Sequence, residues 1–252
     1  MDSDVRRQEI LTQARTNGSV DVTALSSALG VSPETVRRDL RSLEEHGLVK
    51  RTHGGAFPVE SAAYETTLAL RTRRQVPQKT RIAVTAAGLI ADAETIFVDE
   101  GFTPQLLAET LTDRPLTVVT ASLTTAALLS SRPHLTVIQL GGRVRPGTVA
   151  TVGHDCTRML SALVIDLAFV GANGISREYG LTTPDPSVGE VKAQAVRSSK
   201  RRVLISLSRK FGVVSFSRFA EISDFEAIVT DTGLSSAEAQ RYTLLGPQVI
   251  RV

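Results

Sequence analysis

Hydrophobic positions in the first sixty residues recur at helical spacing in three short stretches. The pattern predicts an amphipathic helix over 4–16, a second short helix over 23–29 and a third over 33–46. Gly30 ends the second helix, and Ser32 suits the N-cap of the third because its hydroxyl can accept a backbone amide. Two helices joined by so short a turn are typical of a helix-turn-helix.

The third helix has two contrasting faces. Val36, Leu40 and Leu43 fall on one side and are expected to pack inward. The opposite side and its flanks carry charged and hydroxyl groups, namely Glu34, Thr35, Arg37, Arg38, Arg41, Ser42 and Glu45. Guanidinium and hydroxyl groups suit base edges and phosphates. An ordinary solvated helix surface remains the alternative interpretation.

A short hairpin is expected after the third helix. Residues 48–52 are strand-like, 53–55 form a Gly-rich turn, and 56–57 can return as a second strand. Such a hairpin adds a wing to the helix-turn-helix.

From about residue 78 onward, β-branched runs alternate with helical segments. The predicted strands are 95–98, 116–120, 137–140, 167–170, 203–205, 227–229 and 249–252. The predicted helices are 79–91, 103–111, 122–130, 155–163, 187–199 and 235–243. Strands separated by single helices predict an α/β fold with a mostly parallel sheet.

Small and polar residues gather directly after four of these strands, at 99–103, 120–122, 141–143 and 171–174. Ligands bind at the carboxyl ends of parallel strands, and exposed amides in glycine loops favour anions. Each cluster alone is also explained by ordinary turn chemistry. Four together favour a small-molecule site.

Composition narrows the class of protein. Of the 252 residues, 42% are hydrophobic and 22% are charged, and no apolar run is long enough to cross a membrane. The charged N-terminus predicts no signal peptide, and the single Cys156 fits a reducing cytosol, so we expect a cytoplasmic protein. The four scattered histidines predict no metal site, and we expect no cofactor.

The positive charge is concentrated in one segment. Net charge is +3, and residues 60–82 hold five basic and only two acidic side chains. This segment is expected to be a basic linker or an electrostatic contact, with a solvated helix face as the alternative.

The N-terminal motifs resemble the DeoR family of bacterial transcription regulators. The resemblance is carried by the runs 25–40, 43–48 and 51–56, with TVRRDL at 35–40 and HGGA at 53–56 as its most specific parts. It implies a winged helix-turn-helix that binds an operator in double-stranded DNA. The DNA-binding residues that it implies are Ser32, Thr35, Arg37, Arg38, Arg41, Lys50, Arg51, His53 and Gly54.

The resemblance continues through the C-terminal block, at 79–83, 171–175, 180–185, 191–192 and 210–212. It implies an effector domain that resembles ribose-5-phosphate isomerase in fold and binds a phosphorylated sugar or related metabolite. The effector-binding residues expected here are Lys79, Asp99, Gly101, Thr103, Thr120, Ser122, Gly142, Lys192 and Lys210.

Several positions depart from the family pattern in what we expect to be one pocket. Glu100 and Phe102 stand in the first loop, Ala121 replaces an Asn, Val188 a Glu and Leu207 an Asp. These changes indicate an altered choice of effector or loss of effector binding, with harmless drift at non-contact positions as a third alternative.

The organisation expected is a DNA-binding domain over 1–58, a basic linker over 59–78 and an effector-binding and oligomerisation domain over 79–252. The function expected is a non-enzymatic regulator, most simply a repressor of carbohydrate-metabolism genes, acting as a homodimer or homotetramer. A constitutive DNA-binding protein and a sugar-phosphate isomerase remain as alternatives.

Overall fold

The computed structural model describes residues 3–17, 19–45, 48–52, 54–58, 72, 75–112 and 114–252. The chain divides into two compact units, residues 1–66 and 67–252, and each is described by itself. Most of the expected linker lies outside the described residues, among them Arg71, Arg73 and Arg74.

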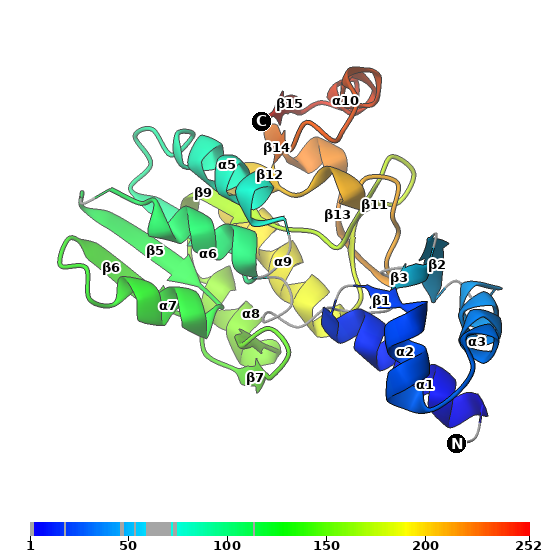
Figure 1. The fold of residues 1–252 in the computed structure, drawn as a ribbon. Helices are drawn as coiled ribbons and strands as arrows, with labels where there is room; N and C mark the ends of the chain where they lie inside the picture. Colours follow the sequence, from blue (N-terminus) through cyan, green and yellow to red (C-terminus); the bar gives the residue numbers. More distant parts are fainter. Residues whose placement is uncertain are drawn as a thin grey trace. The chain divides into compact units, whose positions relative to one another are not determined.

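The N-terminal unit is a winged helix-turn-helix (Figure 1). Its elements are α1 (Ser3–Asn17), β1 (Val20–Asp21), α2 (Val22–Leu29), α3 (Pro33–Glu45), β2 (Val49–Thr52) and β3 (Gly55–Pro58). The three strands pair in the order β1-β3-β2, so β1 extends the wing hairpin into a small antiparallel sheet. The apolar faces predicted from the sequence meet in one core of Ile10, Leu11, Ala14, Leu25, Val36, Leu40 and Leu43 with their neighbours.

Side-chain caps define the turn between α2 and α3. Asp21 accepts the amides of Thr23 and Ala24 at 2.8 and 3.0 Å at the start of α2. Gly30 ends that helix with a φ of 64°, a left-handed conformation that glycine adopts without steric cost. Ser26 then closes the turn through its hydroxyl, which donates to the Val31 carbonyl at 2.6 Å.

The C-terminal unit is built on a seven-stranded parallel sheet in the order β15-β14-β12-β9-β4-β5-β6. These strands are β4 (Thr95–Val98), β5 (Leu116–Thr120), β6 (Leu135–Gln139), β9 (Ile165–Val170), β12 (Ser199–Ile205), β14 (Ala227–Thr230) and β15 (Gln248–Arg251). All seven were predicted from the sequence. The order reverses between β4 and β9, which makes this pair the switch point of a doubly wound sheet.

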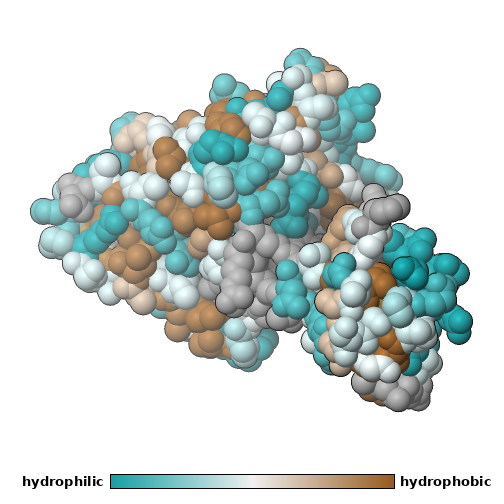
Figure 2. All heavy atoms as spheres, in the orientation of Figure 1, coloured by the Kyte–Doolittle hydropathy of each residue, from teal (hydrophilic) through white to brown (hydrophobic). Residues whose placement is uncertain are grey.

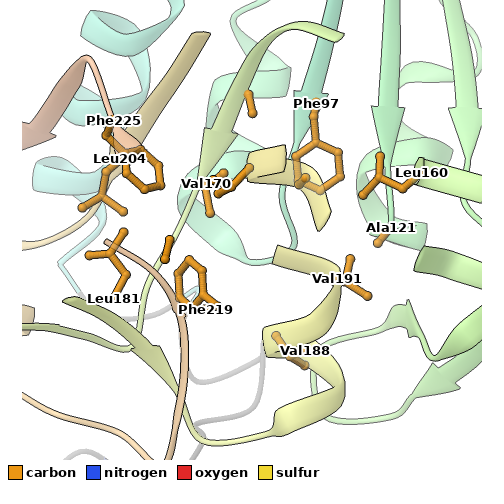
Figure 3. Close-up of a cluster of buried hydrophobic side chains, with 14 of the residues drawn as sticks. Phe97, Ala121, Leu160, Val170, Leu181, Val188, Val191, Leu204, Phe219 and Phe225 are labelled. Carbon is orange, nitrogen blue, oxygen red and sulfur yellow. The ribbon is translucent and has the colours of Figure 1, made fainter. Parts of the chain in front are cut away.

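Helices cover both faces of this sheet (Figure 1). They are α5 (Val76–Ala87), α6 (Phe102–Glu109), α7 (Leu123–Leu129), α8 (His154–Ser161), α9 (Pro186–Ser198) and α10 (Ser236–Thr243). Buried residues of α5, α6 and α7 pack with one set of strand side chains, whereas α8, α9 and α10 pack with the alternate set. Figure 3 shows part of the second cluster, with Phe97 and Val170 from the sheet beside Val188 and Val191 from α9.

Five short strands lie outside the main sheet. β7 (Arg143–Arg145) and β8 (Ala150–Val152) form a hairpin. β10 (Gly174–Ser176), β11 (Gly180–Thr183) and β13 (Ser217–Ala220) form a three-stranded antiparallel sheet. Two short 3-10 helices, η1 (Ser208–Lys210) and η2 (Ile222–Asp224), complete the unit. The sequence pattern missed all five strands, because runs of three or four residues carry too few apolar positions to show a period.

Candidate functional site

The outer face of α3 presents three arginines to solvent. Arg37, Arg38 and Arg41 are all exposed. Arg37 lies 3.4 Å from Glu34, a loose and exposed pair worth little energy. Within the described part of the chain, Arg38 and Arg41 have no ion pair or side-chain hydrogen bond. Two guanidinium groups one helical turn apart are therefore available to an external anion.

The inner side of α3 is fixed to α1 by polar contacts. Asp39 is buried and accepts both Arg6 Nε at 2.5 Å and Arg6 Nη2 at 3.2 Å. Arg7 Nη1 donates to the Ser42 hydroxyl at 2.9 Å. Bidentate Arg–carboxylate pairs impose orientation as well as attraction. The basic face of α3 is therefore held rigidly on the unit.

The start of α3 combines capping with exposed hydroxyls. Ser32 Oγ accepts the Thr35 amide at 3.2 Å and lies 2.9 Å from Thr35 Oγ1. Ser32 is exposed and Thr35 half-buried. Both expected DNA-binding residues thus lie at the N-terminus of the helix, where amides and the helix dipole favour a phosphate.

The wing holds Arg51 against the end of α3. Glu44 accepts the Arg51 amide at 2.9 Å and Arg51 Nε at 2.6 Å. Gly54 accepts the Val22 amide through its carbonyl at 2.8 Å, which ties the wing turn to α2. His53 and the side chain of Lys50, both expected in the interface, lie outside the described residues.

In the C-terminal unit, the switch point brings together a buried ion pair. Asp99 follows β4 and Lys192 projects from α9, and their side chains are 2% and 3% exposed. Asp99 Oδ2 accepts from Lys192 Nζ and from the Gly171 amide, the latter at 2.8 Å. Lys192 Nζ also donates to the Gly171 carbonyl at 3.2 Å. Two residues expected in the effector site are thus joined across the point where β4 and β9 end.

A second carboxylate lies beside this pair, and a second lysine contacts the loop that carries it. Glu100 is buried, with Oε1 4.0 Å from Lys192 Nζ. Lys79 in α5 is also buried, and its ammonium lies 5.4 Å from the ring centre of Phe102. The face of an aromatic ring attracts a cation, so Phe102, which stands where the family pattern has a hydroxyl residue, gains Lys79 on α5 as a partner. The first loop is therefore in contact with both α5 and α9.

The remaining expected effector residues have local roles in the turns. Thr120 Oγ1 accepts the Ser122 amide at 3.0 Å, and Ser122 Oγ caps α7 by accepting the Thr125 amide at 3.2 Å. A Cβ on Gly142 would lie 2.6 Å from the Val152 carbonyl, so glycine is required for packing there. Gly101 and Thr103 sit at the start of α6, and half-buried Lys210 ends η1.

Three of the five positions that depart from the family pattern are buried in the apolar clusters on the two faces of the sheet. Ala121 and Val188 belong to the apolar cluster that α8 and α9 cover, where Figure 3 labels both. Leu207 belongs to the cluster on the other face of the sheet. Apolar side chains at these three positions contribute to the core. Glu100 lies beside the Asp99–Lys192 pair, and Phe102 follows in the same loop as the first residue of α6.

The sequence pattern missed a further polar cluster at the ends of β12 and β14. Asp231 accepts the amide and hydroxyl of Ser208, each at 2.7 Å, and the Gly233 amide at 3.0 Å. Burial alone would raise the pKa of Asp231, but these hydrogen bonds together lower it below its ordinary value. The sequence shows an Asp just after a predicted strand. Which residues it contacts depends on which strands are neighbours in the sheet, and the sequence alone does not show that. Among the described residues, no group of His, Cys, Asp and Glu could hold a metal ion.

Two family descriptions match this chain. Residues 6–62 match a DeoR-like helix-turn-helix domain, and residues 74–232 match a DeoR C terminal sensor domain. Among curated proteins, the chain is 32% identical to the transcriptional regulator GlpR of Haloferax volcanii over 97% of this chain and 96% of that protein. It is 35% identical to the lactose phosphotransferase system repressor of Staphylococcus epidermidis over 90% and 91% of the two chains.

Solved structures show weaker similarity. Ribose 5-phosphate isomerase A from Methanocaldococcus jannaschii matches at 16% identity and a TM-score of 0.37, over 53% of each chain. RipA from Yersinia pestis matches at 18% identity and a TM-score of 0.45, over 69% of this chain and 50% of that one.

The helices of the described ranges are all too short or too polar to span a bilayer.

Proposed function

This chain belongs to the DeoR family of DNA-binding transcriptional regulators, and we propose that it represses carbohydrate-metabolism genes in response to a phosphorylated sugar or a related metabolite. In this proposal the winged helix-turn-helix binds operator DNA, and a metabolite bound to the sensor domain changes that affinity. The relatives of the chain are transcriptional regulators and repressors, and the family is not one of enzymes. The isomerase alternative is therefore set aside.

The observation that carries the proposal is the pair of exposed arginines on α3. Arg38 and Arg41 point away from a core that fixes the opposite side of the same helix. A guanidinium group can donate two hydrogen bonds to guanine in the major groove, or bind a phosphate. Ser32 and Thr35 at the helix start would contact the DNA backbone.

The proposed effector site is the switch point around Asp99 and Lys192. Open α/β sheets bind ligands where the strand order reverses, at the carboxyl ends of the strands. Carboxylate oxygens can accept sugar hydroxyls, and an ammonium can bind a phosphate. A sugar-derived effector is supported by one relative, whose name identifies it as a repressor of a lactose phosphotransferase system.

The route proposed from effector to DNA passes through Phe102 and α5. Phe102 is the first residue of α6, directly after the Asp99–Gly101 loop, and Lys79 packs over its ring. Lys79 lies in the first turns of α5, which begins at the end of the expected linker. A ligand that moves the loop would thus move the helix next to the linker and shift the balance between DNA-competent and DNA-incompetent states.

One observation favours the constitutive alternative. The Lys192 ammonium is already bonded to Asp99 and Gly171, and Ala121, Val188 and Leu207 are packed into the core. If the site takes no ligand, no sugar phosphate will stabilise the protein, because a ligand that binds only the native state must raise its stability. Thermal unfolding with and without millimolar ribose, fructose and glucose phosphates separates the two functions.

The DNA-binding part is tested by Arg38→Ala. If Arg38 binds a base, the variant loses about 1–3 kcal/mol of affinity for the operator and little for scrambled DNA of equal length. If Arg38 binds a phosphate, both affinities fall alike. Fluorescence anisotropy on DNA from upstream of the gene gives both values. Arg241→Ala, an exposed arginine on α10, is the matched control. Unchanged affinity of Arg38→Ala for both DNAs would contradict the assignment of α3.

A further inference from the structure

A carboxylate lies in the middle of the basic face of α3. Glu34 is exposed on the same side of the helix as the arginines. By helical geometry, Arg37 and Arg38 lie about 60° and 40° to either side of Glu34, and Arg41 lies about 20° from it, two turns further along. Figure 2 shows hydrophilic residues where Figure 1 draws α3. A duplex that contacts these arginines therefore contacts Glu34 as well.

The place of Glu34 along the helix favours contact with bases. It is the second residue of α3, directly after Pro33. In helix-turn-helix proteins, the N-terminal residues of the recognition helix contact base edges in the major groove. The opposite side of α3 is buried and fixed to α1 by the pair between Asp39 and Arg6. The carboxylate is therefore carried on a rigid element, at the end of the helix that enters the groove.

A negative side chain on this face is unfavourable unless the DNA offers it a donor. The phosphates repel a carboxylate, so Glu34 opposes the attraction between the arginines and the DNA backbone. Its pair with Arg37 spans 3.4 Å between side chains that are 65% and 56% exposed, so the ion pair offsets little of this repulsion. In the major groove, cytosine presents its N4 amino group as a donor, and carboxylates accept from it.

We propose that Glu34 determines operator specificity by accepting a hydrogen bond from the N4 amino group of a cytosine. The inference rests on the proposed function, because it requires α3 to lie in the major groove of operator DNA. Opposite a base without that amino group, Glu34 loses its donor and keeps its repulsion from the phosphates. The carboxylate thus acts against wrong sequences, while the arginines supply attraction to any duplex.

The test compares the base preferences of full-length variants. The DNA is the fragment from upstream of the gene, with each position of one half-site changed in turn to all four bases, and fluorescence anisotropy gives each affinity. At one position, wild type should bind cytosine at least fivefold more tightly than the other bases. Glu34→Ala should reduce this preference to within twofold. Glu34→Gln should move it to adenine, because a carboxamide pairs with adenine N6 and N7.

Glu45→Ala is the matched control. Glu45 is exposed on the same side of α3 and carries the same charge, about three turns further from the N-terminus. Its removal should raise the affinity for every DNA alike and leave the base preferences unchanged. A second control combines Glu34→Gln with Arg37→Ala. The adenine preference should persist in this double variant, because residue 34 contacts the base directly rather than by orienting Arg37.

Three results would overturn the inference while leaving the proposed function intact. Glu34→Ala could keep every base preference of wild type within twofold. It could instead change all affinities equally, as Glu45→Ala does, which would leave Glu34 with a charge effect alone. The lost preference could also be one that Arg37→Ala removes in the same way, so that Glu34 only orients Arg37. Failure of the proposed function is distinct: wild type would then bind the upstream fragment and scrambled DNA alike, and both proposals would fall.

Discussion

Removing the Lys192 ammonium should destabilise the sensor domain more than any surface change. In Lys192→Met, the side chain keeps similar length and apolar bulk but leaves the Asp99 carboxylate without its cation. The Asp99 side chain is 2% exposed and cannot recover water in place of the ammonium. The Gly171 amide still donates to the Asp99 carboxylate at 2.8 Å. Among the hydrogen bonds of Asp99 described above, this is the one that remains to stabilise its negative charge.

The expected cost is about 3 kcal/mol. Breaking a buried ion pair by removing one partner typically costs ~3–5 kcal/mol, because an uncompensated charge remains. The retained Gly171 hydrogen bond places this case at the lower end. For a unit of this size, 1 kcal/mol lowers the melting temperature by roughly 2–4 °C, so a fall of about 6–12 °C is expected.

Circular dichroism melts of the full-length protein at pH 7 measure this fall. Lys200→Met is the matched control, since Lys200 is exposed and its bond to Asp166 is a surface ion pair that contributes little to stability. The double variant Asp99→Asn with Lys192→Met should lose less than the two single changes added together, because the pair is coupled. A fall below 2 °C for Lys192→Met, equal to the control, would refute the description of a buried ion pair.

Three further predictions address other parts of the fold. Gly55→Ala should unfold the wing and abolish operator binding in gel-shift assays, because its Cβ would lie 2.1 Å from a carbonyl of β1; normal binding would contradict the β1–β3 pairing. Asp166 accepts a hydrogen bond from Lys200, and its hydrogen bonds lower the pKa of its carboxyl below the ordinary value. The stability that Asp166 contributes to the fold is therefore present above about pH 4 and is lost as the pH falls. Asp166→Asn should therefore cost about 1 kcal/mol at pH 7 and progressively less in acid, measured by urea unfolding, and a pH-independent difference would refute it. Phe102→Leu should lower stability by roughly 0.5–2 kcal/mol, because Lys79 loses its aromatic partner, whereas an unchanged melt would show that their contact has no energetic value.

The strands of the main sheet and the helices of the two units were predictable, because their repeating apolar positions extend over enough residues to recognise. Strands such as 95–98 and 116–120 were predicted with the bounds observed. The hairpin β7–β8 and the strands of the small sheet were missed, since Gly174 and Gly180 indicate turns in a sequence read alone. Their pairing depends on tertiary contacts, as when the Ser215 amide donates to Thr182 Oγ1 at 2.8 Å.

The candidate site was predictable in part. Clusters after strands correctly placed Asp99 at a carboxyl end, but the sequence alone does not give strand order. That order puts β4 beside β9 and so brings Gly171 to Asp99. The resemblance pointed to Lys192, whose burial and bond to Asp99 required the structure. The burial of Val188 and Leu207 among apolar side chains also required the structure, because burial is not visible in a single sequence.

The most direct test of the central claim is anisotropy of the purified protein on DNA from just upstream of its own gene. Scrambled DNA is the reference, in about 150 mM salt because phosphate contacts make affinity salt-dependent. The titration is repeated with ribose, fructose and glucose phosphates at millimolar concentration. The account predicts selective binding whose affinity one of these compounds changes at least fivefold. Equal affinity for both DNAs would contradict operator recognition, and selective binding that no sugar phosphate alters would contradict the proposed effector.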